Sequence, residues 1–196
     1  LGVESFSTPV YKKEHYMQKL IKTQKVTAMI YIVMAIIIFL YSLCFMTEYS
    51  DLFGLMLKTN SHITNFYKNI LQKFNWQIFR LSLGGIAGIV LIYVLEIMTK
   101  VVDKFALIVI EALLLFNIGG CGYSIMNLNA IQAYYKTLDF QYIELEGVSD
   151  YVLKFTAFNI GNVVYVGQII VSLAFGIVIA ACHIKFVKCR RENNGK

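Results

Sequence analysis

The stretch that decides the fold is Val26–Met46, VTAMIYIVMAIIIFLYSLCFM, in which no residue is charged. At 1.5 Å per residue, an α-helix of this length reaches about 30 Å, the thickness of the hydrocarbon core of a bilayer. Buried strands are much shorter, and a surface helix of a soluble protein carries polar residues on one face. The stretch therefore predicts a membrane-spanning helix.

Composition and three further apolar stretches extend this prediction to the whole chain. Hydrophobic residues make up 58% of the 196 residues and charged residues only 15%, against about 25% charged in an ordinary soluble domain. We therefore expect an all-α membrane protein, a four-helix transmembrane bundle of the tetraspan kind. The expected spans are 26–46, 78–98, 105–127 and 162–184.

Lysine and arginine predict the orientation of the bundle. Twelve of the 18 lie in the N-terminal arm 1–25, the short link 99–104 and the tail 185–196. Because cytoplasmic loops carry the excess of positive charge, both termini are expected in the cytoplasm, with outer loops at 47–77 and 128–161. The net charge of +6 then favours anionic lipid headgroups at the inner face. No basic patch interleaved with aromatics indicates nucleic-acid binding.

Two segments outside the bundle 26–184 have helical patterns. The basic, amphipathic arm alternates lysines with apolar residues over 10–25, which fits either a helix on the inner surface or a solvated extension. In the first outer loop, 60–76 is expected to form an amphipathic helix that either binds a partner or caps the bundle. Its apolar stripe consists of Ile63, Phe66, Tyr67, Ile70 and Phe74, with Trp76 at the headgroup level.

Polar residues within the expected spans are the best functional lead, because ionisable groups in hydrocarbon are costly and need partners or water. We single out Glu111 for a titratable cluster with His183 or Glu96, and a protonated structural glutamate is the alternative. Amide side chains can form interhelical hydrogen bonds or line a path. The intramembrane polar residues are Glu96, Glu111, Asn117, Gln168 and His183.

Glycines are expected to let helices approach closely, since packing rather than hydrophobicity drives helix association in lipid. Gly84 and Gly88 form a GxxxG pattern, and Gly119, Gly120 and Gly122 cluster in the third span. In the fourth span the glycines are spread out. They are Gly161, Gly167 and Gly176. These faces could serve either the internal bundle or a second protein.

Signals for catalysis or metal binding are missing from the sequence. No cysteine pair has CxxC spacing, the three histidines lie in different regions, and no nucleotide loop or HExxH pattern occurs. No enzyme activity, cofactor or metal is therefore expected. Cys189, next to Arg190 and Arg191 at the end of the fourth span, is a candidate for palmitoylation.

The layout resembles that of the broad tetraspan group, which includes claudin-like proteins, MARVEL proteins and tetraspanins. The most economical expectation is an organiser or auxiliary subunit that associates with other membrane proteins, or with copies of itself, through its spans and outer loops. The alternative is a homo-oligomeric ion channel or proton-sensitive pore that uses Glu111, Asn117 and Gln168, and a small transporter ranks third. The plasma membrane is favoured over an internal organelle membrane.

Overall fold

The computed structural model describes residues 9–44, 57–58, 65–92, 100–138, 144–145 and 156–194. Within these ranges the fold is all-α, as expected, and a two-residue antiparallel strand pair joins the two loops. Leu57 pairs with Leu145, and Lys58 with Glu144. The elements are α1 (Pro9–Cys44), β1 (Leu57–Lys58), the π-helix η1 (Phe66–Leu71), α4 (Gln72–Ile92), α5 (Lys104–Tyr135), β2 (Glu144–Leu145) and α6 (Thr156–Asn194).

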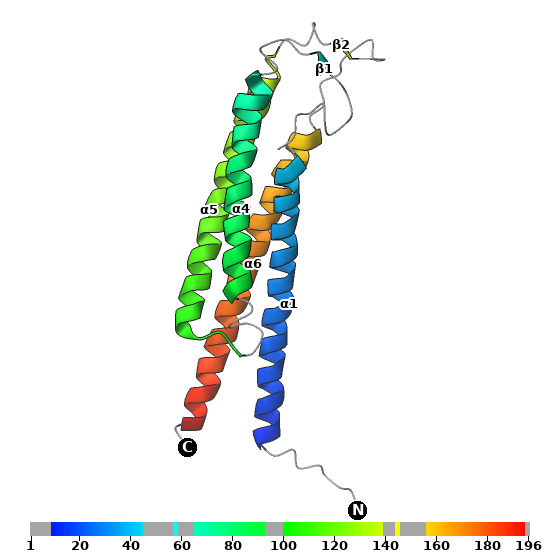
Figure 1. The fold of residues 1–196 in the computed structure, drawn as a ribbon. Helices are drawn as coiled ribbons and strands as arrows, with labels where there is room; N and C mark the ends of the chain where they lie inside the picture. Colours follow the sequence, from blue (N-terminus) through cyan, green and yellow to red (C-terminus); the bar gives the residue numbers. More distant parts are fainter. Residues whose placement is uncertain are drawn as a thin grey trace, which may run out of the picture.

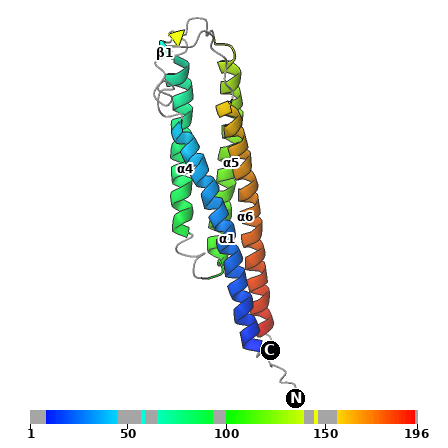
Figure 2. The same ribbon diagram turned by 90° about the vertical axis from the view of Figure 1, so that its right-hand side faces the viewer.

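The four long helices run alternately up and down in one elongated bundle (Figure 1). α6 packs extensively on both α1 and α5, whereas α4 packs on α1 and makes fewer contacts with α5. Figure 2 shows α4 on the side of the bundle away from α6. We call the end where α1 begins and α6 ends the termini end, and the end that carries β1 and β2 the loop end.

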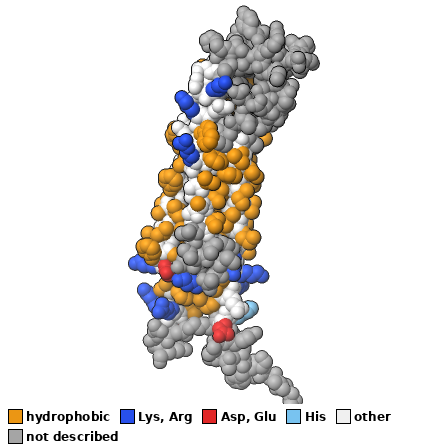
Figure 3. Space-filling model, in the orientation of Figure 1, with side chains coloured by type: hydrophobic (Ala, Val, Ile, Leu, Met, Phe, Trp, Pro, Cys, Tyr) orange, Lys and Arg blue, Asp and Glu red, His pale blue; other side chains and the backbone are white. Residues whose placement is uncertain are grey.

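Three of the helices are long and apolar enough to cross a membrane. They are the segments Glu14–Leu43, Lys104–Tyr135 and Phe158–Glu192. Apolar side chains such as Val33, Leu115 and Ile177 are exposed along them, and a hydrophobic belt lies between basic groups at the two ends (Figure 3). Such a belt is stable in hydrocarbon and not in water. The chain is therefore a multi-pass integral membrane protein that contacts lipid.

At two of the expected boundaries the structure has a continuous helix. Residues from 9 to 25 are the first turns of α1, in line with the expected span. The chain's one proline, Pro9, stands at the first position of α1, where its missing N–H is harmless, and no glycine or proline follows before Cys44. Likewise, the described part of the loop helix joins the second expected span through η1. Residues 93–98 lie outside the described ranges.

Aromatic side chains close the bundle at the loop end. Phe66 of η1 is fully buried, with its ring centroid 5.5 Å from that of Tyr135. The ring centroids of Tyr135 and Phe158 of α6 lie 5.4 Å apart. Phe74 is also buried. The inner part of the expected loop stripe therefore serves the packing of the bundle itself.

The remaining members of that stripe are placed less uniformly. Ile70 is half-buried against the same cluster, whereas Trp76 is 46% exposed. Ile63 and the side chain of Tyr67 lie outside the described part of the chain.

A second set of contacts fixes the link before α5 at the termini end. The fully buried Gln24 of α1 donates to the Lys100 carbonyl at 3.4 Å and accepts from the Val102 amide at 3.5 Å. From α6, His183 Nδ1 lies 2.8 Å from the Val102 carbonyl oxygen. Asp103 caps α5 by accepting from the Ala106 amide at 2.9 Å. The link is thereby held against both α1 and α6.

Substitution of Gln24 should destabilise the bundle. Gln24→Leu keeps most of the side-chain volume but leaves the buried Val102 amide without its acceptor, which costs about 1–3 kcal/mol. We expect a lower midpoint of thermal unfolding in detergent micelles. Gln18→Leu, at an exposed position of the same helix, is the control and should leave the midpoint unchanged. Equal midpoints for the two variants would contradict the structural role of Gln24.

Candidate functional site

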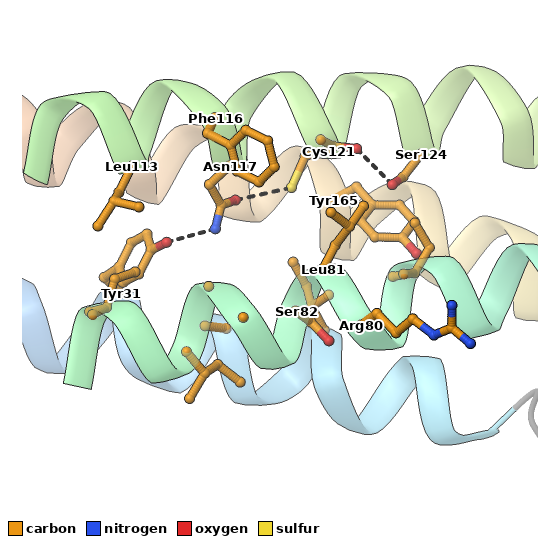
Figure 4. A pocket seen from close by; sticks show the side chains of 18 residues that line it. Tyr31, Arg80, Leu81, Ser82, Leu113, Phe116, Asn117, Cys121, Ser124 and Tyr165 are labelled. Carbon is orange, nitrogen blue, oxygen red and sulfur yellow. Dashed lines mark hydrogen bonds between the residues drawn. The ribbon is translucent and has the colours of Figure 1, made fainter. Parts of the chain in front are cut away.

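A cavity of about 240 Å³ lies between α4 and α5, with α1 behind it and Tyr165 of α6 at one end (Figure 4). Its walls are mainly apolar, and its volume comes from glycine. A Cβ atom added at Gly84 or Gly120 would meet nothing within 4 Å, and one at Gly85 would lie 3.9 Å from Asn117 Nδ2. The two helices are thus kept apart at a level where neither has a side chain to fill the space.

A hydrogen-bonded chain of polar side chains runs along the wall of this cavity. Asn117 of α5 donates through Nδ2 to the Tyr31 hydroxyl of α1 at 2.6 Å. Its Oδ1 accepts from the Cys121 thiol at 3.4 Å, and Ser124 donates to the Gly120 carbonyl at 2.7 Å (Figure 4). Polar groups at this depth require partners within the protein. Asn117, one of the expected intramembrane polar residues, therefore joins α5 to α1.

Three buried polar side chains of α6 have no hydrogen-bond partner in the part of the chain that the structure describes. They are Tyr165, Gln168 and Ser172, each at most 1% exposed. Neither the oxygen nor the nitrogen of the Gln168 side chain has a hydrogen-bond partner among the described residues. A buried unpaired amide or hydroxyl costs about 1–3 kcal/mol. Tyr165 lines the cavity, whereas Gln168 and Ser172 do not.

Glu111 does not meet His183 in the structure. The Glu111 carboxylate is half-buried against α6, where a Cβ atom at Gly176 would lie 2.9 Å from its Oε2. His183 is engaged with the Val102 carbonyl. The expected cluster is therefore not assembled between these two residues, and Glu96 lies outside the described ranges. The structure instead places the Glu111 carboxylate against Gly176, where a larger residue would require the end of this flexible side chain to move.

The other glycines divide into two groups by their surroundings. On α6, a Cβ at Gly161 would clash with the Tyr41 hydroxyl and with Leu128, and one at Gly167 would lie 3.0 Å from Met34 Cε. On α5, Gly119 and Gly122 have nothing within 4 Å of an added Cβ. Gly88 of α4 has ordinary contact with Leu113. Close helix approach at glycine is thus observed on α6, whereas Gly119 and Gly122 leave open space.

Arg80 lies at the loop end of the cavity. The sequence alone did not identify it as a site residue. Its side chain is exposed, lines the cavity, and places its guanidinium carbon 5.8 Å from the centroid of the Trp76 ring. Tyr31 and Tyr165 were also missed as site residues. Both put a hydroxyl inside an apolar span, so the rule that intramembrane polar groups need partners could have found them.

Cys189 is half-buried near the end of α6, and its palmitoylation stays a prediction. Within the described ranges, no three histidine, cysteine, aspartate or glutamate side chains come together in a way that could hold a metal ion.

The contrast between glycines is open to direct test. Gly161→Ala should destabilise the bundle by about 1–3 kcal/mol, because the added methyl group overlaps Tyr41 and Leu128. Gly119→Ala adds the same methyl group in open space and should be neutral, or stabilising through its higher helix propensity. Thermal unfolding in detergent measures both. A Gly161→Ala variant as stable as Gly119→Ala would show that α6 does not pack at this position as described.

Comparison with known proteins finds no family model, no curated protein and no solved structure that matches this chain. Functional assignment therefore depends on the bundle, its glycine faces and its cavity.

Proposed function

We propose that this chain is a non-enzymatic tetraspan protein, with both termini in the cytoplasm, that acts as an organiser or auxiliary subunit of other membrane proteins. The observation that carries the proposal is the incomplete cover of α5. Only 17% of the most apolar 18-residue stretch of α5 is buried inside the bundle, against 33% for the corresponding stretch of α1 and 39% for that of α6. A helix so weakly covered by its own bundle has a face available to a partner.

The uncovered face of α5 has the shape that transmembrane helices use to associate. Leu115 and Met126 are 67% and 74% exposed, and Gly119 and Gly122 lie between them at helical spacing with open space in front. Small residues flanked by larger ones let a second helix approach its backbone, and van der Waals packing then drives association in lipid. We name Leu115, Gly119, Gly122 and Met126 the α5 face.

Two features support four spans rather than three. α4 runs beside α1 in the same bundle (Figures 1 and 2), and its exposed side chains Leu81, Leu83 and Val90 are apolar. It also lies alongside most of the length of α5 (Figure 1). With α4 as a fourth span, the segments that hold most of the lysines and arginines (9–25, 100–104 and 185–194) lie on the side of the termini, which is the cytoplasmic side by the positive-inside rule. The plasma membrane remains the favoured location.

Photo-crosslinking in native membranes tests this function. A photoreactive residue in place of Leu115 should attach a second membrane protein, and Gly119→Leu in the same chain should abolish the adduct because it fills the space between the larger side chains. The control carries the photoreactive residue at Val163, which is 72% exposed on α6, and should give only background. Equal adducts from Leu115 and Val163 would contradict a partner at the α5 face. An adduct containing only this chain would point to a homo-oligomer.

A second candidate function, a homo-oligomeric ion channel or proton-sensitive pore, is favoured by a different observation. The unpartnered Tyr165, Gln168 and Ser172 follow one another along the interior face of α6, and Glu111 lies against the same helix at Gly176. Water that satisfies these groups would form a polar track through the bundle. Such a track is what proton movement requires.

Gln168→Leu discriminates this second function from a structural role. If Gln168 supports a hydrated track, the variant should lower proton flux into proteoliposomes, measured with a pH-sensitive dye. Its stability should rise, because an unpaired buried amide is removed. Ser172→Ala is the milder companion variant. Wild-type vesicles with no more flux than protein-free vesicles would exclude the pore.

A further inference from the structure

We propose that the cavity between α4 and α5 is a binding site for one acyl chain of an anionic phospholipid, whose phosphate is held by Arg80. This site is distinct from the basic segments at the termini end, where headgroup attraction requires no cavity. It also involves a different surface from the α5 face, so it does not depend on the proposed function.

The length of the cavity matches one leaflet. Its lining runs from Ile78 to Ile89 on α4 and from Leu113 to Ser124 on α5, which at 1.5 Å per residue is a length of about 15 Å. Half of the hydrocarbon core of a bilayer is also about 15 Å. A lipid chain that enters beside Arg80 would therefore reach the Leu113 end near the middle of the membrane.

The cavity opens toward lipid and is apolar along most of its length. Leu81 and Phe116 line it and are themselves 41% and 64% exposed, so its mouth lies on the outer surface between α4 and α5. Its walls include Ile86, Ile89 and Leu113. An acyl chain can thus enter sideways from the bilayer without crossing a polar barrier. It would cover wall atoms that otherwise lack packing partners.

Polar groups for a lipid head gather at the loop end of the cavity. Figure 4 places Arg80, Tyr165 and Ser124 toward one end and Tyr31 and Leu113 toward the other. Trp76, against which Arg80 packs, is a residue type enriched at the headgroup level. Tyr165 lines the cavity, and its buried hydroxyl has no hydrogen-bond partner among the described residues. It can donate to an ester carbonyl oxygen while the guanidinium holds the phosphate.

The local charge selects an anionic head. Residues 65–92 contain Lys68, Lys73 and Arg80 but no aspartate or glutamate, and among the described residues no carboxylate lies within ion-pair distance of Arg80. A zwitterionic head would place its ammonium group near the Arg80 guanidinium, which carries a like charge. A head with a net negative charge gains from Arg80 without that repulsion.

Quenching of tryptophan fluorescence tests the site, because Trp76 is the chain's single tryptophan. The full chain is reconstituted in phosphatidylcholine vesicles that contain a minor fraction of either phosphatidylglycerol or phosphatidylcholine with brominated chains. We expect brominated phosphatidylglycerol to quench Trp76 far more than its share of the lipid predicts, with a local enrichment of about tenfold for one charge-assisted contact. Equal quenching by the two lipids would overturn the proposal.

Paired variants separate the head contact from the chain contact. Arg80→Gln should remove the preference for phosphatidylglycerol, whereas Lys73→Gln, exposed on the same helix and not lining the cavity, should keep it. Gly120→Leu should remove the enrichment by filling the cavity, whereas Ala112→Leu, exposed on the same helix and outside the lining, should not. Enrichment that survives Arg80→Gln and Gly120→Leu alike would mean diffuse attraction to the basic surface and would contradict the site.

Lipid retention provides the second measurement, and circular dichroism verifies that each variant is folded. Phospholipid that co-purifies with wild-type protein is extracted and identified by mass spectrometry. We expect anionic phospholipid in the wild type, a loss of about tenfold in Arg80→Gln and in Gly120→Leu, and a partial loss in Tyr165→Phe. Retention of free fatty acid in place of phospholipid would overturn the choice of ligand.

Discussion

Close approach of α6 to α1 and α5 is the interaction on which the rest of this bundle depends. In lipid the hydrophobic effect does not hold helices together, so direct packing must do so. Gly161 makes room for Tyr41 and Leu128, Gly167 for Met34, and Gly176 for Glu111. Larger residues at these positions would separate the helices and expose the buried polar groups of α6 to hydrocarbon. The three-helix core formed in this way is the frame to which α4 is added.

The same residue type has the opposite effect between α4 and α5. There Gly84 and Gly120 have no opposing side chains, and the helices stay apart around a cavity. At the loop end the bundle is held by the aromatic cluster of Phe66, Tyr135 and Phe158. At the termini end it is held by the contacts of Gln24 and His183 with residues 100–102. Glycine thus permits close packing where a neighbouring side chain occupies the space, and it leaves a cavity where no side chain does. Function is expected where space stays empty.

Polar side chains in the interior differ in whether the chain itself provides their hydrogen-bond partners. The Tyr31–Asn117–Cys121 chain satisfies itself across two helices, and Gln24 and His183 satisfy backbone groups of the link. Tyr165, Gln168 and Ser172 are left over. Since a bilayer supplies no hydrogen bonds in its core, these groups need water or a ligand from outside the chain. Of these three residues, Tyr165 also lines the cavity between α4 and α5.

The sequence by itself determined the all-α class, the membrane environment and the presence of three helices long and apolar enough to span a membrane, because length and hydropathy respond directly to the thickness of hydrocarbon. It also marked Asn117, Gln168 and Gly176 as residues of interest. It could not show that residues 9–25 and 65–76 continue into neighbouring helices, since amphipathic and spanning segments join wherever no glycine or proline interrupts them. The partner of Glu111, the role of Gln24 and the cavity at Arg80 were decided only by tertiary structure. They depend on which faces of four helices meet, and helical spacing within one segment does not contain that information.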